Sequence, residues 1–338
     1  MTMLVKIVDR FKGKKICVIG DVIADIYIYG MPYKLSREAP VVVIKYEEES
    51  LCPGSAGNTI NNLVAMGAEV FPLACVGNDE PGVRLTDYFQ SCGAVRLEGL
   101  IRHEGRTVTK TRILAGDTHT SKQQVIRVDR ENELGVPEAA RAALMKRLVE
   151  IGPDMDAFVI SDYEYGLVDE EIIRCVQDLA RTKIVVGDSR YNLSRFQGFT
   201  LITPNEAEAY AVAGMHNGRD VAEVGKAILK KMDIKALLIT RGNKGMSLFL
   251  KDGTVNHIPI SGSDEIADVT GAGDTVAAVI TLALAAGADF HTASLIANMA
   301  AGIVVMKRGT ATASPDELKK VIAGWIGKRK GANGETAK

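Results

Sequence analysis

The chain has 338 residues, of which 25% are charged, and its formal net charge of −1 excludes a general electrostatic attraction to nucleic acid or to an anionic membrane. Its five cysteines form no C-x-x-C pair, no apolar run approaches membrane-spanning length, and residues 1–15 lack a signal-peptide pattern. We therefore expect a cytoplasmic protein with reduced cysteines and with neither a nucleic-acid nor a membrane partner.

The first strong pattern is an apolar run at residues 15–20, which is followed by Asp21. Parallel strands are apolar on both faces and place ligand-binding groups at their carboxyl ends, so we expect Asp21 at the functional end of a buried strand. Asp25 follows shortly after it. Both carboxylates suit the binding of hydroxyl groups, although turn-forming aspartates at a strand end are an alternative.

Four further strand patterns form two pairs outside the main sheet. They are rich in β-branched and aromatic residues, and no helical pattern lies between the two strands of either pair. They cover residues 26–29, 41–46, 106–114 and 123–128, with a turn at 116–121. We expect a small separate sheet formed from about residues 26–46 and 105–129. An isolated sheet needs its second face covered, which favours a homodimer through this sheet.

Elsewhere strands and helices alternate, as in a parallel α/β sheet. The predicted helices cover residues 56–66, 82–91, 137–150 and 170–180, and the predicted strands cover 70–76, 157–160 and 184–187. The last two strands end at Asp162 and Asp188, which places both at the same sheet edge as Asp21. An aspartate at a strand end can also be a helix cap, so this alternative stays open.

The following segment begins a helix with Asn205 and Glu208, which lie three apart on one helical face and make a good helix start. A glycine turn from Thr240 to Gly245 then joins a buried strand to its hairpin partner at 246–250. A late apolar helix at 290–307 carries Asn298, a buried amide that needs a hydrogen-bond partner.

The stretch 268–280 is a glycine-rich turn that runs into a helix apolar nearly all round, so the start of this helix should lie inside the protein. Unpaired N–H groups of its first turn, at Gly271, Ala272 and Gly273, predict an anion hole. Asp274 at the same place is predicted to be a general base. We also expect Gly273 to need a conformation that only glycine adopts freely. A simple N-cap with a tight turn is the alternative.

A second glycine-rich stretch, Pro53-Gly-Ser-Ala-Gly-Asn58, opens the first long helix. Together with 268–280 it resembles the two signature motifs of the PfkB, or ribokinase-like, family of small-molecule kinases. The resemblance covers about residues 15–324. It implies a three-layer α/β/α sandwich with a mainly parallel sheet and a small β-sheet lid, with residues 1–330 as the kinase domain and 331–338 as a flexible tail.

The resemblance also implies a role for each matching residue, with Asp274 as catalytic base and with ATP and Mg²⁺ as cofactors. The implied sugar-binding residues are Asp21, Asp25, Gly54, Ser55, Asn58 and Asp162. The implied nucleotide-binding residues are Asn205, Thr240, Gly242, Gly245 and Asn298. Asn205 and Glu208 would organise Mg²⁺ through water, and Asp268 and Thr270 match positions that bind K⁺ in relatives.

Within the family the chain looks most like the D-glycero-D-manno-heptose 7-phosphate kinases. The likeness lies in Ser36-Arg-Glu-Ala-Pro40, Thr109-Lys-Thr-Arg112, Gln123-Gln-x-x-Arg127-x-Asp129 and Ser161-Asp-Tyr163-x-x-Gly166. Such a substrate already carries a phosphate. The basic residues expected to face it are Lys110, Arg112, Arg127 and Arg190, although surface solvation would explain each of them singly.

Two positions depart from the pattern of the heptose kinases, which usually have Ser-Pro-Glu and Asp-Pro-Lys where Arg37 and Arg190 stand here. Positive charge is added at the first and kept at the second. A kinase of another sugar or nucleoside (ribose, fructose or adenosine) and a non-catalytic sugar or nucleotide sensor therefore stay open. Because the chain ends at Lys338, we expect the kinase alone, without the nucleotidyltransferase domain of the bifunctional members.

Overall fold

A mainly parallel sheet forms the centre of the computed structural model, which describes residues 2–117, 122–132, 135–262 and 267–335. Within these residues its nine strands are, in spatial order, β13 (Val255–Ile258), β12 (Met246–Leu250), β11 (Ala236–Thr240), β10 (Leu201–Ile202), β9 (Ile184–Ser189), β8 (Ala157–Asp162), β1 (Lys15–Gly20), β4 (Glu69–Gly77) and β5 (Leu100–His103). Neighbouring strands from β11 to β5 are parallel, and only the β11–β12 and β12–β13 pairs are antiparallel.

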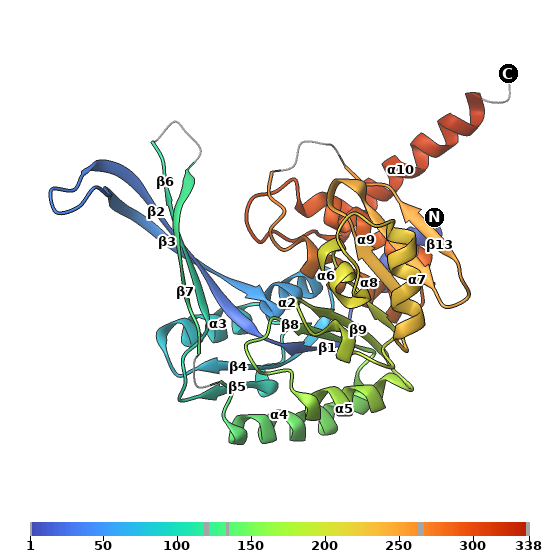
Figure 1. Cartoon of the computed structure of the whole chain (residues 1–338), viewed down its shortest axis with the longest axis horizontal. Coiled ribbons are helices and arrows are strands. Elements are labelled where there is room, and N and C mark those ends of the chain that lie inside the picture. Colours follow the sequence, from blue (N-terminus) through green and yellow to red (C-terminus); the bar gives the residue numbers. More distant parts are fainter. Residues whose placement is uncertain (1, 118–121, 133–134, 263–266, 336–338) are drawn as a thin grey trace.

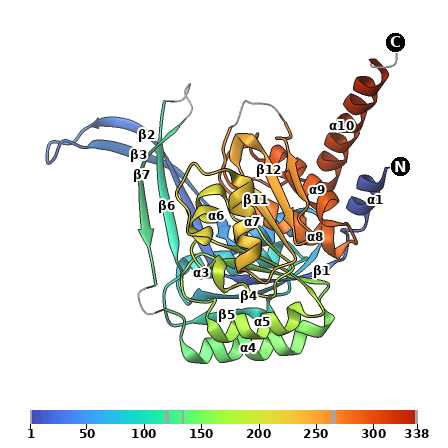
Figure 2. The ribbon, with the colours of Figure 1, turned by 45° about the vertical axis from the view of Figure 1, so that its right-hand side comes forward.

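Helices cover both faces of this sheet, because its strands are apolar on both sides (Figures 1 and 2). In β1, for example, Val18 packs into one core and Ile19 into the other. The first face is covered by α1 (Met3–Asp9), α2 (Ala56–Ala65), α3 (Glu80–Ser91), α8 (Ala272–Ala285), α9 (Phe290–Val304) and α10 (Pro315–Glu335). The second face is covered by α4 (Glu138–Ile151), α5 (Glu170–Ala180), α6 (Glu206–Ala213) and α7 (Val221–Lys231).

A second sheet projects from this body as an arm, which we call the lid (Figure 1). Its strands, in order, are β3 (Val42–Ser55), β2 (Val22–Leu35), β6 (Thr109–Ala115) and β7 (Gln123–Arg130). The separate sheet predicted from sequence is present, although β2 and β3 are much longer than the predicted strands. The inner ends of β2 and β3 are buried, and the three glutamates Glu47–Glu49 interrupt the apolar pattern of β3. Residues 118–121 of the predicted turn lie outside the described residues.

The helix α8 is buried almost from end to end, as the sequence predicts, with every residue from Asp274 to Leu284 inside the protein. The last helix, α10, differs from the prediction because it continues to Glu335, into the segment for which a flexible tail is predicted. Residues 336–338 lie outside the described part. Among the described helices, none combines the length and hydropathy needed to span a membrane.

Candidate active site

Three aspartates gather at one edge of the main sheet, where β1, β8 and β9 end. The parallel register pairs Gly20 with Ser161 and Ser161 with Asp188, so Asp21 and Asp162 follow at the same level in adjacent strands, and Asp188 lies one residue earlier in the next strand. This clustering was predicted from the strand ends alone. The first turn of α8 lies against the same edge and brings Asp274 to it.

Asp274 is held from two sides by hydrogen bonds to its two carboxylate oxygens. Asn58 Nδ2 donates to Oδ2 at 2.8 Å, and the Tyr163 hydroxyl donates to Oδ1 at 2.9 Å. The side chain is 5% exposed, and burial raises the pKa of Asp274 to about 6, while the two hydrogen bonds oppose this rise. A carboxyl group with a pKa near neutrality, fixed in orientation, has the properties of a general base.

Asn58 is itself held by a buried polar network between α2 and α8. Asn62 lies four residues later on the same helical face, and its Nδ2 donates to the Asn58 backbone oxygen at 2.9 Å. The Thr275 hydroxyl bonds to Asn62 Oδ1 at 3.0 Å and to the Gly271 oxygen at 3.1 Å. Because all three side chains are buried, this network fixes how the two helices, and hence Asn58 and Asp274, lie against each other.

The glycine turn before α8 corrects one expectation, because Gly271 and not Gly273 is the conformationally demanding position. Gly271 has a φ of 77°, and a Cβ placed there would lie 2.3 Å from Asn58 Nδ2. A Cβ on Gly273 would meet no atom within 4 Å, and its φ is not positive. Gly273 lies inside the first turn of α8, where ordinary helical angles apply.

The amides of this turn match the predicted anion hole only in part. The Ala272 N–H donates to the Val269 oxygen at 3.2 Å, so it is not free to bind an anion, in contrast to the prediction. Among the described residues, no backbone oxygen accepts from the N–H groups of Gly271 and Gly273. An anion at this turn would therefore be bound by these two glycine amides together with the positive end of the α8 dipole.

Four of the predicted sugar-binding residues, Asp21, Asp25, Gly54 and Ser55, lie where β2 and β3 leave the main body. Asp21 Oδ2 accepts backbone N–H groups from Tyr163 at 2.9 Å and Tyr165 at 3.2 Å, and burial raises the pKa of Asp21 to about 6. Gly54 must be small, because a Cβ there would lie 2.2 Å from Asp25 Oδ2. Ser55 has a φ of 55°, a strained conformation for a residue with a side chain, of the kind that accumulates at functional sites.

Asp162 has a structural role that the sequence did not indicate. Its Oδ1 accepts from the Glu164 N–H at 3.0 Å, and its Oδ2 accepts from Ser189 Oγ at 3.0 Å and Asn192 Nδ2 at 3.2 Å. With 2% exposure, this carboxylate ties together the loops after β8 and β9. Its contact with substrate stays a prediction.

The four basic residues expected to face a substrate phosphate fall into two pairs. Arg112 forms a buried ion pair with Asp25, and Arg127 binds both carboxylate oxygens of Asp129 at 2.8 Å. Lys110 and Arg190 have no carboxylate partner within hydrogen-bonding distance in the described part of the chain. Burial lowers the pKa of Lys110, the charges of Asp25 and Asp129 oppose this shift, and the positive charges of Arg190 and Arg127 add to it. These two cations are thus the ones poised to bind an anion.

Arg112→Met should destabilise the protein because the Asp25 carboxylate, 6% exposed, would lose the cation that it contacts. We expect the free energy of unfolding in urea to fall by about 3 kcal/mol, the usual effect of breaking a buried pair. Arg127→Met is the matched control, because this pair is half exposed and should contribute less than about 1 kcal/mol. Equal losses in the two variants would show that the burial of the Asp25 pair is not what matters.

Most of the residues predicted to bind the nucleotide or to organise Mg²⁺ form hydrogen bonds with other groups of the protein. Asn205 Oδ1 accepts from the Glu208 N–H, and Glu208 Oε2 accepts from the Asn205 N–H, both at 2.9 Å, which is a reciprocal helix cap. Asn298 Nδ2 donates to the Pro259 oxygen at 2.8 Å. In both places the structural alternative that the sequence left open is realised. Burial raises the pKa of Glu208, while the hydrogen bond from the Asn205 N–H and the positive charge of Arg190 oppose this rise.

The predicted glycine turn after β11 is also present, between antiparallel strands β11 and β12. The Thr240 N–H donates to the Pro204 oxygen at 2.9 Å, which joins this turn to the start of α6. Gly242 and Gly245 both have positive φ, and a Cβ on Gly245 would lie 2.1 Å from the Ile258 oxygen. The turn therefore favours glycine at both positions. It lies beside Asn205, at the start of the helix that carries Glu208.

The described residues contain no group of three or more His, Cys, Asp or Glu side chains that could hold a metal ion. Asp268 accepts from the N–H groups of Thr270 at 2.9 Å and Gly309 at 3.0 Å. It thereby ties the segment before α8 to the segment after α9.

Three residues that hydrogen-bond within this site were given no role by the sequence prediction, namely Tyr163, Asn62 and Thr275. Tyr163 follows Asp162 at the end of a core strand, so its position at the functional sheet edge was available as a signal. Asn62 shares a helical face with Asn58. The signal for Thr275 was absent, because only the packing of α2 on α8 brings its hydroxyl to Asn62.

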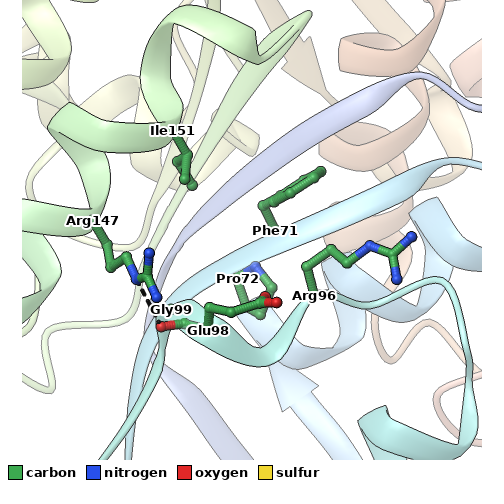
Figure 3. Close-up of a pocket in the computed structure, with 7 residues that line it drawn as sticks. All are labelled: Phe71, Pro72, Arg96, Glu98, Gly99, Arg147 and Ile151. Atoms are coloured by element: carbon green, nitrogen blue, oxygen red, sulfur yellow. Dashed lines mark hydrogen bonds between the residues drawn. The ribbon is translucent and has the colours of Figure 1, made fainter.

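A separate hollow of about 250 Å³ lies near the start of β5, away from Asp274 (Figure 3). Phe71, Pro72 and Ile151 form its apolar part, and Arg96 and Arg147 flank it. Both arginines are already paired, with Glu69 and Glu150 respectively. None of the predicted site residues lines this hollow.

Solved structures with the same fold are sugar kinases of ribokinase-like architecture. The chain matches a ribokinase from Arabidopsis thaliana, complexed with ribose and ATP, with a TM-score of 0.72 and 18% identity, covering 91% of this chain and 98% of that one. Phosphofructokinase-2 from Escherichia coli matches with a TM-score of 0.75 and 16% identity, covering 92% and 98%. The predicted three-layer ribokinase-like fold is confirmed.

Residues 13–317 match the family described as pfkB family carbohydrate kinase. The chain belongs to this family and is a phosphotransferase that acts on a sugar hydroxyl with ATP and a metal ion. The bifunctional protein HldE of Geobacter metallireducens is 40% identical over 89% of this chain and 61% of the relative. That of Geobacter sulfurreducens is 38% identical with the same coverage. The chain thus spans about three-fifths of the length of these relatives.

Proposed function

We propose that this protein phosphorylates the anomeric hydroxyl of D-glycero-D-manno-heptose 7-phosphate, with Mg-ATP as the phosphoryl donor. The observation that carries the reaction is Asp274, buried at the start of α8 and held by two donors. The heptose 7-phosphate assignment is supported by the sequence likeness to heptose 7-phosphate kinases, by the two HldE relatives and by the two unpaired cations near the site.

The proposed chemistry follows from where the described groups lie. Asp274 accepts the proton of the attacking hydroxyl, and its raised pKa suits this role near neutral pH. The amides of Gly271 and Gly273 stabilise negative charge on the transferring phosphoryl group. Mg²⁺ on the nucleotide would neutralise phosphate charge, and Glu208 and Asn205 would orient its water ligands. K⁺ between the Asp268 and Gly309 loops is an additional proposal of the same kind.

Lys110 and Arg190 are proposed to bind the phosphate that the sugar already carries. Lys110 Nζ lies 5.9 Å from the ring centre of Tyr163 and 5.6 Å from that of Tyr165, so the cation is held by aromatic faces and not by a carboxylate. Arg190 follows β9, and its charge acts on Lys110. Two cations close enough to repel each other would gain from binding an anion between them.

The proposed function is tested by measuring kcat/KM for heptose 7-phosphate, sedoheptulose 7-phosphate, fructose 6-phosphate, ribose and fructose. We expect heptose 7-phosphate to be the best substrate. Lys110→Met and Arg190→Met should each lower its kcat/KM about ten- to a hundredfold, the worth of a charge-assisted contact of about 1.5–3 kcal/mol. A free sugar that equals every sugar phosphate would favour a ribose or fructose kinase instead. Nucleotide binding without any turnover would favour a sensor.

We also propose that the protein forms a homodimer through the lid. The support is the number of large apolar side chains that the projecting lid exposes, since exposed apolar surface of this kind often marks an interaction site. The large apolar side chains exposed there are Tyr33, Leu35, Val41, Val42, Tyr46, Val125, Ile126 and Val128. A second lid would cover them and also pair or shield the open edges of the four-stranded sheet.

A further inference from the structure

Tyr163 contacts three parts of the candidate site from one position directly after β8. Its hydroxyl donates to Asp274 Oδ1 at 2.9 Å, and its backbone N–H donates to Asp21 Oδ2 at 2.9 Å. Its ring also lies under Lys110. It thereby connects the catalytic carboxylate, a sugar-side carboxylate and a lid cation.

We propose that Tyr163 is a positioning residue for phosphoryl transfer, which holds the Asp274 carboxylate in one orientation and in its proton-accepting form. The proposal rests on the proposed role of Asp274 as general base. Two donors on different oxygens fix the carboxylate plane, because a single donor would leave it free to rotate. Each oxygen keeps a further lone pair, which remains open to a substrate hydroxyl.

The Tyr163 hydroxyl remains a donor throughout the working range of pH. Burial raises its pKa well above the usual value, and the Asp274 carboxylate raises it further, so the phenol stays protonated. It can therefore stabilise the ionised carboxylate without competing for the substrate proton. Asn58, whose amide does not titrate, acts the same way on the other oxygen.

The charged groups around Asp274 come from the lid and from the neighbouring strand. Asp25 raises the pKa of Asp274 and Lys110 lowers it, while Asp188 of β9 interacts with it as a like charge. The helices α2 and α9, which pack against α8, contain no Asp, Glu, Lys or Arg, and α9 has only His291 at its exposed start. Asn58 and Tyr163 are therefore the neutral donors that keep the buried carboxylate ionised.

The test is the pH dependence of kcat/KM for the best sugar phosphate, at saturating ATP between pH 5 and 9, for the wild type and Tyr163→Phe. Because the base acts when ionised, activity should fall as pH drops through about 6 in the wild type. Loss of the hydroxyl should move this acidic limb up by about one pH unit. The variant would then be about fivefold less active at pH 6 and close to the wild type at pH 8.5.

Tyr165→Phe is the matched control, because its ring also lies under Lys110 while no hydrogen bond joins its hydroxyl to Asp274. Its acidic limb should stay in place, and thermal unfolding should show that both variants are folded. A Tyr163→Phe loss that is the same at every pH would mean a merely structural role and overturn the inference. If Asp274→Asn stays active, the proposed role of Asp274 as general base fails, whereas an inactive Asp274→Asn with an unmoved Tyr163→Phe limb refutes only the role of Tyr163.

Discussion

Asp274→Asn is expected to lower kcat by about two to four orders of magnitude, the usual contribution of a general base, while leaving ATP binding intact. The structure shows why the fold should survive this change. The new side-chain oxygen can still accept from Asn58 Nδ2, and the new amide can donate to the Tyr163 hydroxyl, which is able to accept. The measurement is steady-state turnover of the best sugar, together with calorimetric titration of a non-hydrolysable ATP analogue.

The control for this experiment is thermal unfolding of the variant, which should stay close to that of the wild type because both hydrogen bonds can be remade. Retention of more than a tenth of the wild-type kcat in a folded variant would remove Asp274 from the role of base. The anion-binding turn and the family assignment would not be affected by that result, because neither depends on the carboxylate.

Gly271→Ala is expected to have the second largest effect, since it should damage both folding and catalysis. An alanine at a φ of 77° costs roughly 1–2 kcal/mol, and its Cβ would lie 2.3 Å from Asn58 Nδ2. The displaced Asn58 could no longer orient Asp274, and the Gly271 amide would move from the turn. We expect kcat to fall about a hundredfold or more, by analogy with loss of one oxyanion donor.

The matched variant is Gly273→Ala, two residues further along the same turn. Because its Cβ meets no protein atom within 4 Å, the free energy of unfolding should stay within about 1 kcal/mol of the wild type. Urea denaturation of the two variants separates conformational strain from obstruction of a phosphate. Equal stability of Gly271→Ala and the wild type would show that the turn relaxes, and that the positive φ is not required.

By itself the sequence determined the fold class, because apolar runs with carboxylates at their ends alternate with helical patterns throughout the main body. The cluster of Asp21, Asp162 and Asp188 follows from this alternation, since parallel strands bring their carboxyl ends to one edge. The buried helix α8 with Asp274 at its start was equally predictable, because no amphipathic surface helix is apolar nearly all round. A local sequence pattern predicts such elements well, because the same periodicity determines their secondary structure and which of their side chains are buried.

Only the tertiary structure decided which polar groups meet. The length of strands β2 and β3 depends on their pairing with each other and of β2 with β6, which joins segments far apart in the chain. Arg112 could not be separated from Lys110 by sequence, because the ion pair with Asp25 joins segments far apart in the chain. The same holds for Asn58 and Tyr163, which reach Asp274 from α2 and β8 because packing of α8 on both elements places their donors at its two oxygens.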